Sequence, residues 1–343
     1  VFVLSILTTL IFVILKDINM LTGLRYYRGG ADGLTHEYQA INIVYNLFNG
    51  NVTQAFRGGA DIFYFMPGLR YFIAINKVIF GSTNHGYLLI TLLMPVFLFK
   101  FLKNITSEKY AFIFIISFLI FPIFENMGFG FYNYIHQVTR NHAETLSITL
   151  IIISIYILTN KNFFNKPKKL SMFMVCAFLA LAVFLRPNFL PTSILLFIFI
   201  LFKTRNNISL LFFSLLGYSF IFLCLAHNLY FGNNWVFFTK ASAHFAINEN
   251  PISHYLNQMV KWNPIYNLHR LVILIIVTFY IVKKNNTLFI YFLYLCCISQ
   301  HFVLILTHPD SRYAYLAWLL TFLLFIKIIY ENRIFGLLNI KLF

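Results

Sequence analysis

The sequence contains very little negative charge. Only 10 of its 343 residues are Asp or Glu, all charged residues together make up 10% of the chain, and 60% of the residues are hydrophobic. A soluble protein of this length could not cover its surface with so few charges. The composition, with a mean hydropathy of +0.77, therefore indicates a membrane protein.

Cysteine and the short motifs of soluble enzymes are also scarce or missing. All four cysteines (Cys176, Cys224, Cys296 and Cys297) lie within apolar segments and lack the spacing of metal ligands. Neither a disulfide framework nor a zinc site is therefore predicted. The sequence has no glycine-rich phosphate loop, nucleophile elbow or redox pair. No cofactor is identified, and nothing indicates a divalent metal, although its use stays open.

Long apolar segments, by contrast, recur throughout the chain. A segment that crosses a bilayer as a helix needs about 20 mostly apolar residues. We expect an all-α polytopic membrane protein in which residues 1–343 form one transmembrane domain with about ten spans. The first span is expected to be incomplete, because Val1 already lies inside an apolar run. The predicted spans are residues 1–15, 87–102, 110–124, 143–159, 171–185, 188–202, 208–226, 270–282, 287–306 and 313–330.

The connections between these spans differ in charge. One set carries 14 basic and two acidic residues, and the other carries 12 basic and eight acidic residues. Because basic residues concentrate in short cytoplasmic loops, the first set is predicted to be cytoplasmic and the second extracytoplasmic. The concentration of basic residues in the cytoplasmic connections accounts for the net charge of +16. No nucleic-acid partner is therefore expected. We predict a plasma (inner) membrane protein whose site faces the extracytoplasmic side.

The first extracytoplasmic loop, residues 16–86, is too long to be a simple connection. It contains the pentapeptide Arg-Gly-Gly-Ala-Asp twice, at 28–32 and 57–61, and paired glycines allow a sharp turn. After each copy, the spacing of apolar residues predicts an amphipathic helix lying on the membrane surface. The first helix has its apolar stripe at Leu34, Tyr38, Ile41, Tyr45 and Phe48. The second begins near Pro67, with Leu69, Phe72, Ile73, Asn76 and Phe80 on one face and Arg70 and Lys77 opposite.

Three residues at the start of the first surface helix are candidate catalytic groups. Asp32 lies four residues before His36, one helical turn away on the same face, whereas Glu37 lies about 140° round the helix from Asp32. Asp32 is interpreted either as a general base at the membrane boundary or as a helix N-cap. Asp61, in the second copy, is interpreted as structural, because Pro67 rather than a reactive polar cluster follows it.

Arg186 and Arg312 are candidate donor-phosphate-binding residues. Each lies beside a proline break at the outer end of a span. An arginine in that place either snorkels to the interface or holds a lipid-linked phosphate with its planar fork. His308 and Tyr313 are close enough in sequence to Arg312 to join this grip, although His308 is also consistent with an ordinary helix-end residue.

Further acidic residues lie in the outer segments as secondary candidates. Asp310 lies in the last outer turn, and Glu125 begins the second outer loop. Ion pairing is the expected role for Glu125 and for the other charged or titratable residues of that loop, which are Arg140, His142 and Glu144.

Together these features resemble the GT-C superfamily of integral-membrane glycosyltransferases, most of all the protein O-mannosyltransferases and the lipid A aminoarabinose transferases. The resemblance covers most of the chain as architecture. It implies a catalytic acidic residue in the first outer loop, where Asp32 lies in the stretch Arg-Gly-Gly-Ala-Asp-Gly-Leu-Thr-His-Glu. The family often has adjacent acidic residues there, but Gly33 follows Asp32 here, which leaves the role of Glu37 open. The stretch His-Pro-Asp-Ser-Arg-Tyr at 308–313 resembles the late basic element that holds the carrier phosphate.

The resemblance implies transfer of a sugar from a polyprenyl-phosphate-linked donor, with inversion at the anomeric carbon. Such a donor already has a good leaving group, so one base and cations that hold the phosphate suffice. The expected partners are this donor and membrane lipids; the sugar, the carrier length, the oligomeric state and the acceptor, whether protein, lipid or glycan, stay open. Two alternatives remain: a polysaccharide polymerase or O-antigen ligase, and a lipid-linked-sugar flippase or transporter, which would need charges within its spans.

Overall fold

The computed structural model describes residues 1–16, 31–59, 66–83, 85–121, 124, 127–165, 167–237, 253, 264–306 and 311–332. Every regular element within these ranges is a helix. The helices are α1 (Phe2–Lys16), α2 (Ala31–Phe48), α3 (Val52–Arg57), α4 (Pro67–Phe80), α5 (His85–Thr91), α6 (Leu93–Ile105), α7 (Glu108–Ile120), α9 (Phe131–Val138), α10 (Ala143–Thr159), α11 (Lys161–Asn165), α12 (Lys169–Leu185), η3 (Pro187–Phe189), α13 (Leu190–Thr204), α14 (Ile208–Tyr218), η4 (Ser219–Phe222), α15 (Leu223–Gly232), α18 (Pro264–Lys283), α19 (Leu288–Leu306) and α20 (Ser311–Glu331).

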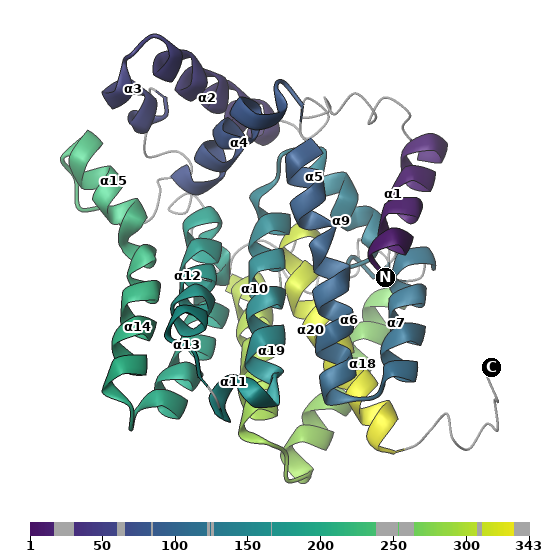
Figure 1. The fold of residues 1–343 in the computed structure, drawn as a ribbon. Helices are drawn as coiled ribbons and strands as arrows, with labels where there is room; N and C mark the ends of the chain where they lie inside the picture. Colours follow the sequence, from purple (N-terminus) through teal and green to yellow (C-terminus); the bar gives the residue numbers. More distant parts are fainter. Residues whose placement is uncertain are drawn as a thin grey trace.

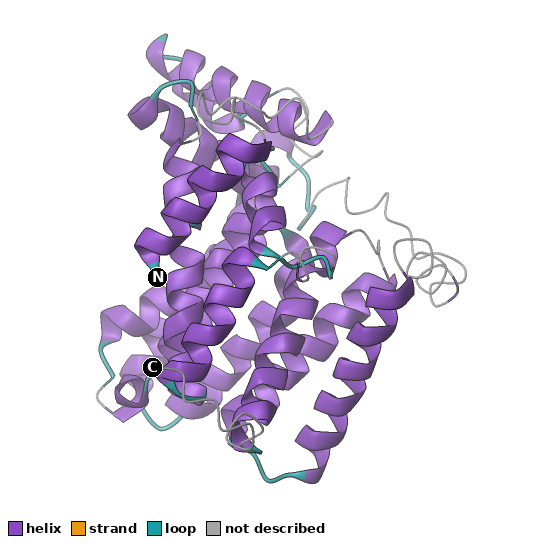
Figure 2. Cartoon of the chain, turned by 90° about the vertical axis from the view of Figure 1, so that its right-hand side faces the viewer, coloured by secondary structure: helices purple, strands orange, loops and turns teal. Residues whose placement is uncertain are grey.

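The helices form a bundle with a short helical layer across one end (Figures 1 and 2). We call this layer, which consists of α2, α3 and α4, the cap. Within the bundle, α10 packs against α6 and α12, α12 packs against α14, and α20 contacts α18 and α19. The core is centred on α20, where Trp318 is only 1% exposed. The cap covers the end of the bundle at which α10 and α20 begin and α12 ends.

Among the described residues, four helical segments are long and apolar enough to cross a membrane, and together with shorter apolar helices they indicate an all-helical membrane protein. Each of the ten predicted spans contains a helix, although ten crossings stay a prediction. The four long segments are His85–Ile105, Pro187–Thr204, Ile208–Gly232 and Arg312–Glu331. The shorter ones are Phe2–Phe12, Ala143–Thr159, Lys169–Leu185 and Leu288–Val303.

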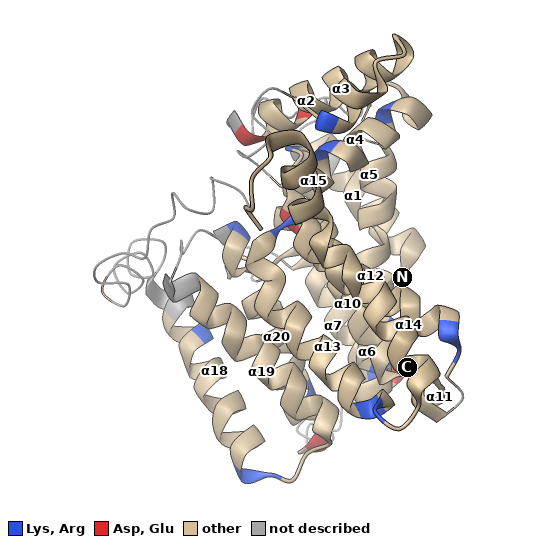
Figure 3. Ribbon diagram, turned by 90° about the vertical axis from the view of Figure 1, so that its left-hand side faces the viewer, with Lys and Arg blue, Asp and Glu red and all other residues tan. Residues whose placement is uncertain are grey.

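Most charged residues lie toward the two ends of the bundle, where the ribbon is blue or red (Figure 3). Far from the cap, Lys103 pairs with Glu108, and Glu331 pairs with Lys284 and with Lys327. The pairs of Lys103 with Glu108 and of Lys284 with Glu331 join neighbouring helix ends and are partly exposed, so each contributes little, on the order of 0–1 kcal/mol. Arginines and buried carboxylates occupy the opposite end, beneath the cap.

Both predicted surface helices are present in the cap, as α2 and α4. The apolar stripe of α2 is exposed, from 43% at Leu34 to 79% at Phe48, as expected for a helix lying on a membrane surface. In α4 the expected division into an apolar and a polar face is wrong, because Arg70 and Lys77 are both buried. Their charges are satisfied inside the cap: Arg70 donates to the Gly58 carbonyl (2.7 Å) and Lys77 pairs with Glu37.

Close backbone contact joins the cap to the bundle. A Cβ atom added to Gly68, in the first turn of α4, would lie 2.6 Å from the carbonyl oxygen of Phe184 in α12. Only glycine allows the two helices to approach this closely. The start of α4 is thereby fixed beside the end of α12, two residues before Arg186.

Candidate functional site

The structure describes the end of the first copy of the repeated pentapeptide and the beginning of the second. In the first copy, Ala31 and Asp32 open α2. In the second copy, Arg57 ends α3, and Gly58 and Gly59 follow with φ angles of 71° and 118°. A side chain at Gly58 would also approach Arg70 Cδ to 2.9 Å, so glycine is required there for both backbone angle and space.

Four charged residues from four helix ends meet beneath the cap, and we call them the charged cluster. They are Asp32 at the start of α2, Glu144 at the start of α10, Arg186 at the end of α12 and Arg312 at the start of α20. Arg312 Nη2 lies 3.2 Å from Asp32 Oδ2, although 280 residues separate the two. Asp32 lies in the first turn of α2.

Glu144 is the buried centre of the charged cluster. Its Oε1 lies 3.1 Å from Arg186 Nη2 and 3.9 Å from Arg312 Nε. The side chain of Glu144 is 2% exposed, whereas those of Arg186 and Arg312 are 16% and 21% exposed. A buried carboxylate of this kind is stable only beside compensating cations. Glu144 therefore holds the two guanidinium groups side by side, although Arg186 and Arg312 lie far apart in the sequence.

Tyr313 lies between the two arginines. Its hydroxyl accepts hydrogen bonds from Arg186 Nη2 (2.6 Å) and from Arg312 Nη2 (3.0 Å). Both guanidinium carbons also lie near the Tyr313 ring, at 5.0 and 4.9 Å from its centroid. His142 Nε2 accepts from Arg312 Nη1 at 3.4 Å. The arginines are thus oriented by several contacts each, in contrast to the freely moving head of a snorkelling side chain.

His36 lies on the same face of α2 as Asp32, as predicted, and is buried at 5% exposure. Burial, followed by the charges of Arg70 and Arg186 as smaller causes, lowers the pKa of His36 to about 3. An imidazole with such a pKa is neutral and only weakly basic at neutral pH. Of the two, Asp32, whose side chain is 34% exposed, is the better placed to take a proton from an incoming group.

Glu37 belongs to a different set of contacts. It forms a buried ion pair with Lys77 of α4 and accepts a hydrogen bond from Asn141 Nδ2 at 3.1 Å. Asn141 has a positive φ of 53° in the turn before α10. Glu37 thus links the cap to that turn, and the structure supports a positioning role for it rather than contact with Arg312.

Four predicted residues lie outside the part of the chain that the structure describes. They are Asp61, Glu125, His308 and Asp310. Among the described residues, no group of three or more His, Cys, Asp or Glu side chains is arranged to hold a metal ion. The cluster therefore offers cationic groups for an anion together with one accessible carboxylate, Asp32.

The sequence did not predict the role of Glu144, which was expected to form an ion pair within its own loop. The structure instead pairs it with arginines from α12 and α20. A usable signal was present, because Glu144 opens the apolar run 143–159, and an ionisable residue within a membrane segment usually has a function and a partner.

No protein-family model, curated protein or solved structure matches this chain significantly.

Proposed function

We propose that the protein is a glycosyltransferase that takes a sugar from a polyprenyl-phosphate-linked donor on the extracytoplasmic face of the membrane. The contact between Asp32 and Arg312 carries this proposal. It joins a partly exposed carboxylate to a pair of oriented arginines at the end of a membrane bundle. That is the minimum set for this reaction: one base for the acceptor and two cations for the departing phosphate.

In the ligand-free arrangement Arg312 is shared between Asp32 and Glu144. A donor phosphate that binds Arg186 and Arg312 would compete with Asp32 for the guanidinium group, because both are oxyanions. Glu144 is too buried to be displaced and would keep both arginines in place. The phosphate would then leave Asp32 beside the anomeric carbon with its carboxylate uncommitted.

The reaction that follows needs no further group. The acceptor oxygen forms a bond to the anomeric carbon while Asp32 takes its proton. The bond between that carbon and the phosphate oxygen breaks, and the electron pair leaves with the phosphate, whose growing charge the two arginines stabilise. Attack opposite to the leaving phosphate inverts the anomeric carbon.

Asparagine substitutions at the two aspartates of the repeat test this proposal. Asp32→Asn keeps the size of the side chain but cannot take a proton, so transfer from a polyprenyl-phosphate sugar should fall by about 10²–10⁴-fold. Asp61→Asn is the matched control and should retain most of the activity. Both variants would be assayed with a panel of labelled donors. Normal turnover by a folded Asp32→Asn protein would remove Asp32 as the base and leave the proposed mechanism without support.

A further inference from the structure

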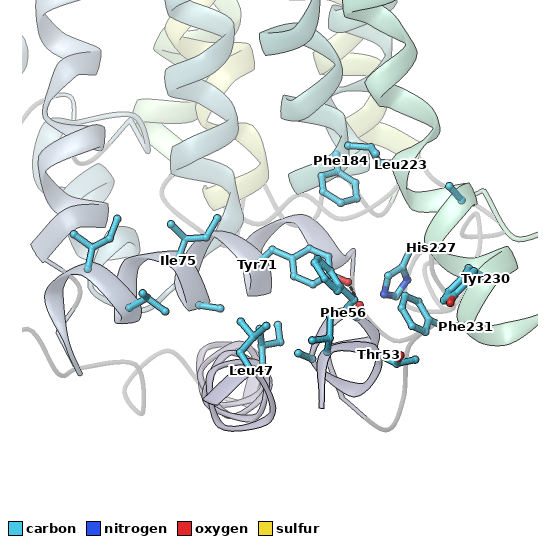
Figure 4. Close-up of a pocket in the computed structure, with 17 residues that line it drawn as sticks. Leu47, Thr53, Phe56, Tyr71, Ile75, Phe184, Leu223, His227, Tyr230 and Phe231 are labelled. Atoms are coloured by element: carbon cyan, nitrogen blue, oxygen red, sulfur yellow. Dashed lines mark hydrogen bonds between the residues drawn. The ribbon is translucent and has the colours of Figure 1, made fainter. Parts of the chain in front are cut away.

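A large apolar pocket lies between the cap and the bundle, apart from the charged cluster (Figure 4). The cavity has a volume of about 990 Å³, at the upper end of the range of roughly 300–1,000 Å³ for small-molecule sites. Its walls come from α2, α3 and α4 on one side and from the end of α12 and α15 on the other. Ile43 and Leu47 of α2 lie in this wall, so the pocket is about 16 Å along the helix from Asp32, eleven residues at 1.5 Å each.

Two of the few polar side chains in the pocket wall are already bonded to the protein. The Tyr71 hydroxyl donates to the Phe56 carbonyl, and His227 Nε2 donates to the Arg57 carbonyl at 3.1 Å. Burial raises the pKa of Tyr71 to about 12, so it stays neutral. Apart from the hydroxyl groups of Thr53 and Tyr230, the remaining wall is aliphatic and aromatic. The pocket therefore offers a polar ligand little to bind, whereas a hydrocarbon chain would find a largely apolar surface.

The pocket continues the lipid-facing surface of a membrane span. Leu223 and Tyr230, which line it, belong to the segment Ile208–Gly232, one of the four long enough to cross a membrane. Only 28% of the residues in an 18-residue apolar stretch of this segment are buried. Leu216, on the same segment, is 45% exposed. A chain from the surrounding bilayer can therefore enter the pocket without crossing a polar surface.

A cation lies beside this apolar wall. Arg57, the last residue of α3, follows the pocket residue Phe56, and its carbonyl is bonded to the pocket residue His227. Its side chain is partly exposed, and no described residue forms an ion pair with it. An arginine whose backbone contacts the wall of an apolar, chain-sized cavity matches a molecule with a phosphate at one end and a hydrocarbon chain at the other.

We propose that this pocket binds one acyl chain of an anionic phospholipid from the surrounding membrane, with the lipid phosphate at Arg57. The site is distinct from the charged cluster, where the donor phosphate is proposed to bind, and it does not depend on the proposed reaction. The bound lipid would fill the space between α4 and α15 and so hold the cap against the bundle. The protein would then carry a structural lipid as part of its fold.

Native mass spectrometry of the full chain, released into detergent from nanodiscs of phosphatidylglycerol, tests this proposal. The wild type should retain one phosphatidylglycerol. Ala226→Trp, which fills the pocket from its exposed wall position, should retain none, whereas Leu216→Trp on the same span should behave as the wild type. Arg57→Gln should lower retention about tenfold, as expected for the loss of one charge-assisted contact of about 1.4 kcal/mol.

Three outcomes would overturn the proposal: no lipid retained by the wild type, equal retention by Ala226→Trp and Leu216→Trp, or displacement of the lipid by one equivalent of a polyprenyl phosphate. The last outcome would assign the pocket to the chain of the donor. Arg57→Gln alters a partly exposed side chain and should fold, so its result counts even if Ala226→Trp is unstable.

Discussion

Removal of the charge on Glu144 should destabilise the protein more than removal of any exposed carboxylate. Its Oε1 lies 3.1 Å from Arg186 and 3.9 Å from Arg312. At an effective dielectric constant of 20, a unit charge pair at 4 Å contributes about 4 kcal/mol. Glu144→Gln loses this attraction to both arginines, which leaves Arg186 without its carboxylate partner and Arg312 with Asp32. Because the arginines are 16% and 21% exposed, water recovers part of the loss, and we expect a cost of about 3–5 kcal/mol, as for other broken buried pairs.

Thermal unfolding in detergent measures this effect, with Glu108→Gln as the matched control. Glu108 pairs with Lys103, but their side chains are 68% and 48% exposed, so the control should change stability by less than about 1 kcal/mol. Added inorganic phosphate should stabilise Glu144→Gln more than the wild type, because the anion would restore part of the negative charge that the two arginines lose. Equal unfolding temperatures for Glu144→Gln and Glu108→Gln would refute the reasoning that Glu144 holds the two arginines together.

Three other predictions concern the cap and the topology. The pKa of His36 is lowered from 6.5 to about 3 in the folded protein, so the unfolded chain binds the extra proton first and stability should fall by up to about 1.4 kcal/mol per unit as the pH drops from 6.5 toward 3. His36→Gln should flatten this pH dependence of thermal unfolding, and an unchanged slope would exclude His36 as its source. Gly68→Ala should cost about 1–3 kcal/mol by overpacking against the Phe184 carbonyl, which an unaltered unfolding temperature would disprove. Cysteines introduced at the exposed positions Val52 and Asn165 should react oppositely with an impermeant thiol reagent, because the four native cysteines are buried; labelling of position 165 from outside would reverse the topology.

The helices of this fold could be predicted from the sequence, because long apolar runs and the spacing of apolar residues determine where they form. Each of the ten predicted spans contains a helix, and α2 and α4 follow the repeat as expected. Orientation within the cap was less accessible, because a helical wheel assumes that charged faces meet water. Arg70 and Lys77 are instead buried, each with a partner on another segment, the Gly58 carbonyl and Glu37. The local sequence pattern does not reveal a partner that lies far along the chain.

The candidate site shows the same limit. Asp32, Arg186 and Arg312 were each identified by an individual signal, a glycine turn or a proline break. The contact between Asp32 and Arg312 spans 280 residues and depends on how α2 lies over the ends of α10 and α20. Glu144 was expected to pair within its own loop because sequence proximity is a poor guide to ion pairs between helices. Tertiary packing, rather than any motif, brings these side chains together.

The central claim is that Arg186 and Arg312 bind the phosphate of a lipid-linked donor, and the affinity for a polyprenyl phosphate tests it most directly. Lysine keeps the charge but loses the planar fork. Arg312→Lys and Arg186→Lys should therefore each weaken binding about 10- to 100-fold, corresponding to a loss of about 1.5–3 kcal/mol. Arg205→Lys, at the opposite end of the bundle, should bind as the wild type does. Equal affinity in all four proteins would contradict the assignment of this cluster as a phosphate site.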